Sequence, residues 1–327
     1  MATGNSSYAT LAATTLEHFA NDIFDNVITN NACLNELKKK GNIKVVSGGT
    51  KFNHPVYYAK NSTFGAISKY GTIATDLQDP LTRAEYDIKV LAGSVVYSIV
   101  EEAMNAGNRE KLIDYVEMLK MDAETSLSEL MGDQVLQAEA SVGTDDFDSI
   151  PKLISIDPTT QSTSPGGIDS SASGNTYWNN YTYISSITSF SGSNVGLTAF
   201  DSCLNGATFG RQGPTFIVTT KTIFTYYMLA LQSQVRYGSL ESGDGAFKRL
   251  MYATLPVMAD DNCPDNYAYF IDANSLKLQV LAQGNMKMTT FQQAYSQLMA
   301  RSIMYVLGNL TCGSRRTCAV TGPITAA

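Results

Sequence analysis

The sequence predicts an α+β fold, and three observations carry this prediction. Residues 109–139 place apolar side chains at the spacing of one long amphipathic helix. Several short apolar runs with strand composition occupy the second half of the chain. Between two further strand-like patches lies a polar stretch, residues 59–79, which is too long for an ordinary turn. With 327 residues, 44% of them hydrophobic, the chain can form one large domain or two modest ones.

The N-terminal part reads as an arm that leads into a strand. Residues 1–8 are small and polar, and residues 14–29 carry apolar side chains at spacings of three and four, which predicts a helix. Gly41 is expected to end a second helix. Ile43–Val46 then has the composition of a strand.

The polar stretch 59–79 is predicted to be the flexible tip of a two-stranded excursion. Strand-like patches at Pro55–Tyr58 and Tyr86–Val90 flank it, and few of its residues are large and apolar. Because a loop of this length inside a compact domain is usually functional or disordered, we expect it to act outside its own domain.

The helix predicted over 109–139 is long. At 1.5 Å per residue it spans roughly 45 Å. Its apolar stripe indicates that one face packs on another element, most simply a sheet, with Leu119 buried there. The stripe consists of Leu112, Val116, Leu119, Ala123, Leu127 and Leu130.

The rest of the chain alternates irregular and regular segments. Residues 140–182 read as an irregular region rich in Gly and Ser, with one short strand at Lys152–Ile156. A helix is expected to begin near Leu197, and Thr219 and Thr220 to cap a helix over Lys221–Tyr237. Strands are predicted at 214–218, 255–258, 267–271 and 276–280, and from 301 to the end of the chain, with turns at Gly308-Asn309 and Gly313.

Charge and composition argue against some functions. Only 16% of the residues are charged and the net charge is −7, so the chain is not drawn to phosphate backbones and sequence-specific nucleic-acid binding is not expected. The basic runs Lys38–Lys40 and Arg315-Arg316 are interpreted as solvated surface. Low charge with many Ser, Thr, Asn and Tyr residues suits a surface covered by neighbouring molecules, although an ordinary globule with a neutral surface has the same composition.

Motifs for catalysis or metal binding are not found. The five cysteines have irregular spacing; Cys312 and Cys318 are close in sequence, but no second pair completes a zinc site, so free thiols in a reducing cytoplasm are expected. The sequence has two histidines and lacks a nucleophile elbow, a Walker A loop and a dinucleotide fingerprint. The acidic clusters at 145–148 and 260–265 are interpreted as solvated loops. We expect no catalytic residue, cofactor, metal, signal peptide or membrane span.

The order of the segments resembles a known family. An N-terminal arm leads to Lys44-Val-Val-x-Gly-Gly-Thr50 and His54-Pro55-Val56; the long loop precedes Tyr86-Asp87-Ile88-Lys89, Ala92-x-Ser94-Val95 and Glu101-x-x-x-Asn105; and the long helix follows Gly107-Asn108. Pro151-Lys152, Gly166-Gly167-Ile168-Asp169, Trp178, Phe216–Thr220, Gln234–Tyr237 and Gly308-Asn309-Leu310 complete the pattern. This order, over nearly the whole chain, is similar to the major capsid proteins of tailed phages, which have the Hong Kong 97-type fold shared with encapsulins.

The resemblance implies a division of the chain. Residues 1–46 would be the N-terminal arm and 47–90 the extended loop, which lies across a neighbouring subunit. Residues 91–182 would form the peripheral domain, including the spine helix at 109–139 and the Gly/Ser-rich loop. Residues 183–262 would form the axial domain, and residues 263–327 would return to the peripheral domain.

The resemblance also implies partners and contact residues. The subunit would assemble with copies of itself, as hexamers and pentamers, into an icosahedral virion shell that encloses double-stranded DNA non-specifically, and assembly would take place in the bacterial cytoplasm. A separate scaffolding protein, a portal and a decoration protein are the other expected partners. Loop residues expected at the contact are Lys60, Phe64, Lys69 and Tyr70, and those expected in the spine-helix core are Leu112, Val116, Leu119 and Leu127. Some relatives link a loop lysine to an asparagine with the help of a glutamate; since no glutamate follows Asn266, no such link at Asn309 is expected.

Two alternatives remain open from the sequence. The same fold serves encapsulins, whose shells hold protein cargo, and neighbouring genes for a terminase and portal or for a cargo enzyme would separate the two. The other alternative is a cytoplasmic enzyme without a recognised motif, which a turnover screen would detect.

Overall fold

The computed structural model describes residues 31–100, 109–188, 190, 195–232, 250–293 and 297–325. Side chains of residues 109–117 and 128 are outside this description, which therefore leaves out the packing of Leu112 and Val116. The helix predicted over 14–29, the Glu101–Asn105 motif and the end of the helix predicted to reach Tyr237 also lie outside the described residues.

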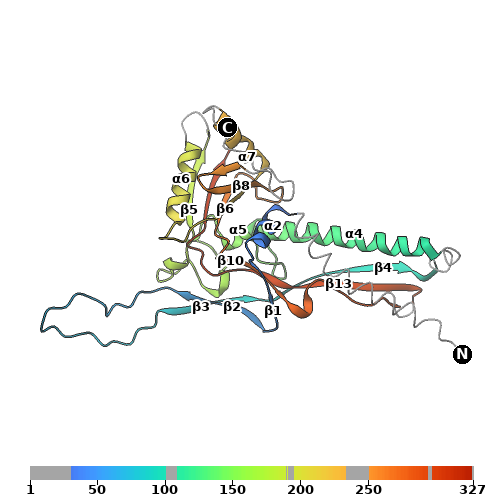
Figure 1. Ribbon diagram of the computed structural model, residues 1–327, viewed down its shortest axis with the longest axis horizontal. Helices are drawn as coiled ribbons and strands as arrows, with labels where there is room; N and C mark the ends of the chain where they lie inside the picture. The colour runs from blue at the N-terminus through green and yellow to red at the C-terminus, as the bar shows by residue number, and fades with distance from the viewer. Residues whose placement is uncertain are drawn as a thin grey trace.

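One sheet is built around a single long strand, β13 (Met299–Cys312), and we call it the long-strand sheet. β13 pairs antiparallel with β10 (Leu276–Leu281), β4 (Lys89–Ser98), β11 (Lys287–Met288) and β12 (Gln292–Gln293). β1 (Ile43–Val46) lies at the edge, parallel to β10, and confirms the strand predicted there. In Figure 1 β4 and β13 run out together beneath a long helix, α4 (Arg109–Leu136).

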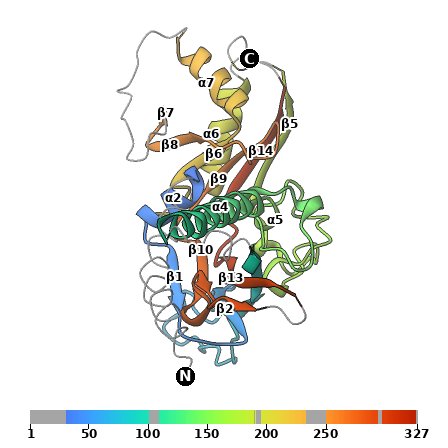
Figure 2. The same cartoon turned by 90° about the vertical axis from the view of Figure 1, so that its right-hand side faces the viewer.

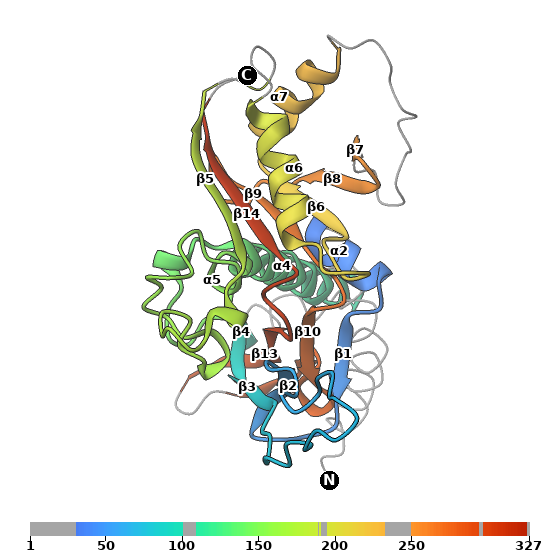
Figure 3. The same ribbon diagram turned by 90° about the vertical axis from the view of Figure 1, so that its left-hand side faces the viewer.

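A second sheet contains parallel and antiparallel pairs, and we call it the mixed sheet. Its strand order is β5 (Tyr181–Ile187), β14 (Ala319–Ile324), β9 (Ala268–Ile271), β6 (Phe216–Thr219), β8 (Leu255–Ala259) and β7 (Leu250–Tyr252). Helices α6 (Val195–Ala207) and α7 (Lys221–Gln232) pack on it, as Figure 3 shows. The predicted start of α6 near Leu197 is confirmed. At the start of α7 the Ile223 nitrogen lies 3.5 Å from the hydroxyl of Thr220, the predicted cap.

The mixed sheet separates two hydrophobic cores. Successive side chains of a strand point to opposite faces, and every residue of β6 and β9 is buried. On β6, Ile217 packs with α6 and α7, whereas Phe216 and Val218 belong to a larger core shared with the long-strand sheet. Both faces are therefore dry, which explains why these strands read as continuous apolar runs in the sequence.

Helix α4 lies between the two sheets, as the end view in Figure 2 shows. Its C-terminal half supplies the buried face: Leu127 is 7% exposed, and Met131 and Val135 follow at intervals of four residues and are fully buried. The predicted stripe is wrong in detail, because Leu130 is 38% exposed and Leu119 is only half-buried. Apolar spacing alone does not distinguish the true stripe from one rotated by a residue.

Three further expectations are wrong. Lys152–Ile156 is not a strand: Ser149 accepts the Lys152 N–H and Pro151 occupies the first turn, so Ile150–Leu153 forms a short helix, α5. Gly308-Asn309 is not a turn but lies inside β13, where Gly308 allows close approach of β10. Residues 263–327 do not return to one sheet, since β9 and β14 pair in the mixed sheet while β10 and β13 lie in the other.

The irregular region 140–182 is held by a buried polar network instead of by strands. Arg315, predicted to be solvated, is fully buried; its guanidinium donates to the Leu153 carbonyl, to Gln161 and to Asn180. Gln161 in turn donates to the Glu139 carboxylate. Short 3-10 turns occur at Glu139–Ser141, Pro165–Gly167 and Thr176–Trp178 in this region, and at Ala282–Gly284 after β10. The remaining described helix, α2 (Ala32–Lys39), ends before Gly41 as predicted.

Replacing Met131 by Ala should destabilise the protein by about 2–5 kcal/mol, because it leaves a cavity beneath α4. Met121→Ala on the same helix is the matched control; Met121 is exposed, so its loss should change the free energy of unfolding by less than about 0.5 kcal/mol. Urea denaturation of both variants measures the difference. Equal losses of unfolding free energy in the two variants would contradict the assignment of Met131 to the buried face of α4.

Candidate inter-subunit contact site

The hairpin of β2 (Lys51–Tyr57) and β3 (Leu81–Asp87) carries the candidate site. The strands pair antiparallel from Lys51 opposite Asp87 to Tyr57 opposite Leu81. β2 alternates strictly between exposed and buried residues, so one face of the hairpin is apolar and packs on the core. The buried side chains of this face are Phe52, His54, Val56, Ala84 and Tyr86.

Two buried polar side chains attach the hairpin base to the long-strand sheet. The Tyr86 hydroxyl donates to the Cys312 carbonyl at 2.8 Å. His54 Nε2 lies 2.9 Å from the Thr311 hydroxyl and 3.2 Å from the Gln279 amide nitrogen. Burial, with a smaller effect from the nearby Lys277 and Lys44 ammonium groups, lowers the pKa of His54 to about 4. His54 is therefore a neutral group that the structure holds through hydrogen bonds.

The 3-10 turn Pro165–Gly167 packs against the same apolar face of the hairpin, beside Ala84 and Tyr86. Gly166 has φ of 68°, and a Cβ added there would lie 2.8 Å from the Ala84 Cβ. Only glycine combines this positive φ with so close an approach to Ala84 without strain. This turn and β13 thus both hold the apolar face of the hairpin base, which fixes the direction in which the tip projects.

A polar cavity of about 500 Å³ opens beside the hairpin base. The charges in it pair with one another: Lys51 with Glu85 and Asp87, Arg83 with Glu85, and Lys152 with Asp148. The Lys89 ammonium donates to the Thr144 carbonyl. The exposed pairs among these add little to stability, and we assign the cavity no ligand.

The loop from 58 to 80 extends the hairpin beyond the folded body and forms no helix or strand (Figure 1). Its large apolar residues have no core to enter: Phe64 is 85% exposed, Tyr70 is 90% exposed and Leu77 is completely exposed. Ile67 and Ile73 are exposed as well. The otherwise polar loop thus exposes five large apolar side chains that the described part of the chain does not cover.

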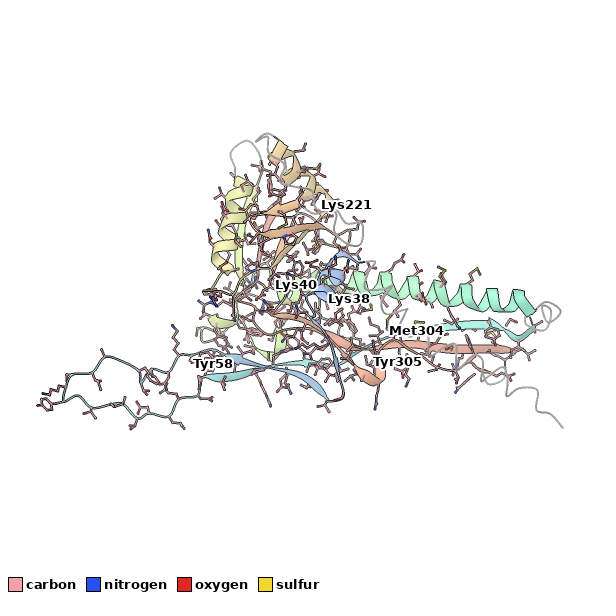
Figure 4. The ribbon with its side chains drawn as sticks, viewed as in Figure 1. Lys38, Lys40, Tyr58, Lys221, Met304 and Tyr305 are labelled. Carbon is pink, nitrogen blue, oxygen red and sulfur yellow. The ribbon has the colours of Figure 1, made fainter. Side chains whose placement is uncertain are left out.

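The four loop residues expected from the sequence are spread along this projection. Lys60, Phe64, Lys69 and Tyr70 are all exposed, and the Lys69 ammonium lies 5.6 Å from the centre of the Tyr70 ring. Tyr58 lies where the loop leaves the body (Figure 4). Its hydroxyl donates to the Asp79 carbonyl at 2.6 Å, and its ring lies 5.1 Å from that of Tyr177. These contacts order the start of the loop but leave its tip unsupported.

A second apolar surface lies between α4 and β4. A groove of about 420 Å³ is lined there by Leu119, Ala123, Leu127 and Leu130 from the helix and by Ala92–Val96 and Met304 from the strands. Leu119 and Leu127 of α4, which the sequence places in the helix core, thus line the wall of an open groove.

The side chains that anchor the site are not predicted from the sequence. The sequence shows no acidic residue close to Asn309, yet the Asn309 amide donates to the Asp148 carboxylate at 3.0 Å and to the Asp87 carbonyl. Asn309 is fully buried, whereas the loop lysines are exposed. Asp148 and Asp260, predicted to be solvated, are also buried, and burial raises the pKa of Asp260. The available signal for the anchors was the strict alternation through Phe52, His54 and Val56, which placed His54 on the apolar face.

Other chemistry is not found in the part of the chain that the structure describes. All five cysteines are free, as expected, and all five are buried. Among the described residues, three or more metal-ligating side chains do not come together. In the same part of the chain, every helix is too short or too polar to cross a bilayer.

Comparison with known proteins agrees with this architecture. No family model matches the chain, and no curated protein matches it by sequence. A chain of the cyanophage A-1(L) capsid superposes with a TM-score of 0.64 at 15% identity, covering 86% of this chain and 90% of its own length. A chain of the satellite phage P4 procapsid superposes with a TM-score of 0.54 at 9% identity, covering 94% of this chain and 91% of its own length. The SrpI encapsulin of Synechococcus elongatus superposes with a TM-score of 0.56 at 8% identity, covering 86% of this chain and 84% of its own length.

These likenesses establish the fold. The chain has the mixed α+β fold of phage capsid proteins, and the resemblance inferred from the sequence is confirmed at that level. The similar structures come from two phage capsids and an encapsulin.

Acid should weaken the hairpin anchor. Below pH 6.5 an unfolded chain protonates His54, whereas the folded chain resists protonation until about pH 4. Stability should therefore fall as pH decreases across this window, and His54→Gln should show a shallower fall. Denaturant titrations from pH 7 to pH 4 measure both slopes, with His18→Gln as the control for loss of the other histidine. Identical slopes in wild type and His54→Gln would contradict the buried, neutral state of His54.

Proposed function

We propose that this chain is the major capsid protein of a tailed-phage-type head and assembles with copies of itself into an icosahedral shell. The observation that carries the proposal is the projecting hairpin, whose base is held against the core and whose tip exposes large apolar side chains that none of the described residues covers. The capsid fold of the similar structures supports it. Hexamers and pentamers are the assembly units that this function requires.

In this proposal the loop 58–80 lies on an adjacent subunit. Burying an exposed large apolar side chain contributes about 1.5–3 kcal/mol, so Phe64, Tyr70 and Leu77 together offer a contact free energy larger than that of a surface ion pair. Lys60 and Lys69 would then supply polar contacts at the margin of the contact. Ordering the loop becomes part of assembly, because the isolated chain gains nothing from it.

The parts of the chain take corresponding roles. We assign residues 1–46 to an N-terminal arm, 47–90 to the extended loop and α4 to the spine of the peripheral domain, which also contains the long-strand sheet. The mixed sheet with α6 and α7 would be the axial domain; on this assignment β9 and β14 belong to it, which changes the boundary drawn from the sequence.

The shell would enclose double-stranded DNA without reading its sequence. A net charge of −7 disfavours tight binding to phosphates, which suits a container for DNA. A separate scaffolding protein, a portal and a decoration protein are the further partners proposed, with assembly in the bacterial cytoplasm and the virion as the final location.

An encapsulin-type shell is the second candidate, because the likeness to the SrpI encapsulin is close to that with the phage chains. The two differ in what closes the shell. Expression of the chain alone, followed by electron microscopy, separates them: an encapsulin forms uniform closed shells by itself, whereas the proposed head protein needs its scaffolding protein for uniform closure.

Replacing residues 59–75 by a short Gly-Ser turn should abolish shell closure and leave the melting temperature of the subunit within about 2 °C of wild type, because the loop adds no core to its own chain. Melting temperature and particle yield are measured together. A large fall in melting temperature, or normal closed shells, would each contradict the proposed role.

A single charge at the loop tip gives a finer test. Tyr70→Asp should reduce particle yield at least about tenfold, since a buried unpaired carboxylate costs the contact several kcal/mol. Thr72→Asp introduces the same charge in the same loop without removing an aromatic ring and should assemble better. Equal yields from the two variants would argue against a buried tyrosine at the contact.

A further inference from the structure

β4 forms an open edge of the long-strand sheet. Among the described strands it pairs with β13 alone, from Lys89 opposite Gly308 to Ser98 opposite Met299. From Val90 to Ser98 it contains neither a charged residue nor a proline. Natural sheets usually protect such an edge with lysine or proline, because its unpaired backbone groups attract another strand. β4 is therefore suited to receive a further strand.

The register shows which backbone groups of β4 point to the open edge. The Ile99 N–H donates to the Leu298 carbonyl at 3.0 Å, which continues the pairing of β4 with β13. Residues of an antiparallel strand bond alternately to one side and to the other, so the odd-numbered residues of β4 bond to β13. The N–H and C=O groups of Ala92, Ser94 and Val96 point away from β13, and among the described residues these groups have no hydrogen-bond partner.

The groove between α4 and β4 runs along this edge. Five consecutive residues of β4, Ala92–Val96, line it, although successive side chains of a strand point to opposite faces. These residues share only their backbone edge, which therefore forms one wall of the groove. A Cβ added to Gly93 at its centre would meet nothing within 4 Å, so the groove has open space there. A strand added to β4 would thus place every second side chain in the groove, against Leu119 and Leu130.

The loop 58–80 contains a segment with the pattern of such a strand. Residues 72–77 read Thr-Ile-Ala-Thr-Asp-Leu, of which three are β-branched. In an extended conformation Ile73 and Leu77 lie on one face and Asp76 lies on the other. Ile73 is 63% exposed, and Leu77 is completely exposed. The segment therefore offers two apolar side chains to a groove and one carboxylate to the opposite side.

The outer face of the long-strand sheet supplies a cation for that carboxylate. Arg301 lies opposite Val96 of β4 and is exposed, whereas its neighbours Ala300 and Ser302 are buried on the other face. Neither Arg301 nor Asp76 forms an ion pair with another described residue. Because neighbouring strands lie about 4.8 Å apart, a strand added to β4 lies about 10 Å from β13. An arginine and an aspartate side chain together span that separation.

The loop and the groove lie at opposite ends of the molecule. In Figure 1 the loop projects on the left, whereas α4, β4 and β13 extend to the right. One subunit can therefore offer its loop to the groove of a second and its own groove to the loop of a third. Such a head-to-tail contact forms a ring when the rotation between subunits closes.

We propose that residues 72–77 of the loop add as a strand to the open edge of β4 in an adjacent copy of this chain. Ile73 and Leu77 enter the groove between α4 and β4, and Asp76 lies on the outer face beside Val96, within reach of Arg301. Backbone hydrogen bonds hold the added strand, and its alternating side chains set the register. The inference rests on the proposed shell function and specifies the receiving surface and the kind of contact.

Paired cysteines test the alternation of the added strand. Val96→Cys is exposed on the outer face of β4, and residues 74, 76 and 78 of an added strand point to the same face. Ala74→Cys, Asp76→Cys and Gln78→Cys are each combined with Val96→Cys in the full chain, and assembled particles are oxidised with copper phenanthroline. At least one pair should give cross-linked oligomers on a non-reducing gel, at least about tenfold more than Thr75→Cys with Val96→Cys, because Thr75 points into the groove.

Two controls locate the contact. Ala74→Cys with Ser202→Cys places the second thiol on exposed α6 of the mixed sheet and should give no cross-linked oligomers. Val96→Cys alone should stay monomeric on the same gel. A dimer from this single variant would overturn the proposal, because the edge of β4 would then pair with its own copy.

Two further results would overturn the proposed docking and leave the shell function intact. One is equal cross-linking through Thr75→Cys, and the other is closed shells in which none of the three outward pairs cross-links. Shells that never form contradict the proposed function instead, and a second measurement then decides the docking site without a shell.

That measurement titrates a labelled synthetic peptide of residues 70–79 onto the unassembled full-length subunit and follows its fluorescence anisotropy. We expect binding that Ser94→Pro weakens at least about tenfold, since proline removes an N–H from the open edge and leaves the bonds to β13 in place. Ser94→Ala keeps this N–H and should bind the peptide as the wild-type chain does. Absence of binding, or equal binding by the proline and alanine variants, would refute strand addition at β4.

Discussion

The pairing of β13 is the constraint on which the rest of the structure depends. This one strand joins β4, β10, β11 and β12, and residues near its end hold two other parts of the chain, the irregular region and the hairpin. Asn309 binds Asp148 in the irregular region, Thr311 faces His54, and the Cys312 carbonyl accepts the Tyr86 hydroxyl. The chain then crosses directly into β14 of the mixed sheet. A break in β13 would therefore release the hairpin, the irregular region and the junction of the sheets at once.

The hairpin is ordered at one end and unsupported at the other. Its base buries Phe52, Val56, Ala84 and Tyr86, whereas its tip exposes Phe64, Tyr70 and Leu77 to water. A chain that folded only for its own stability would gain from covering these side chains. Their exposure is explained if the apolar burial that would order the tip comes from a second subunit, so that folding and assembly draw on separate parts of the same hairpin.

Elements with strong local signals were predictable from the sequence. The Gly41 stop, the strand at Ile43–Val46 and the Thr220-capped helix depend on neighbouring residues, and all three are found. The long helix was also found, but its buried face turned out to centre on Met131 and Val135, because sheet contacts and not spacing alone select the face. β13 passes through Gly308-Asn309 because its pairing with β10 overrides the turn preference of these residues. The anchors at Arg315, Asn309 and His54 depend on partners more than one hundred residues away, which local patterns cannot reveal.

The central claim is that the loop 58–80 gains its order from a neighbouring subunit. Hydrogen–deuterium exchange of this loop, compared between the free subunit and the purified shell, tests it most directly. We predict fast exchange of the amides around Phe64 and Tyr70 in the free subunit and at least about tenfold slower exchange in the shell. Equally fast exchange in both states would contradict the account, because a loop that remains open in the shell does not hold the next subunit.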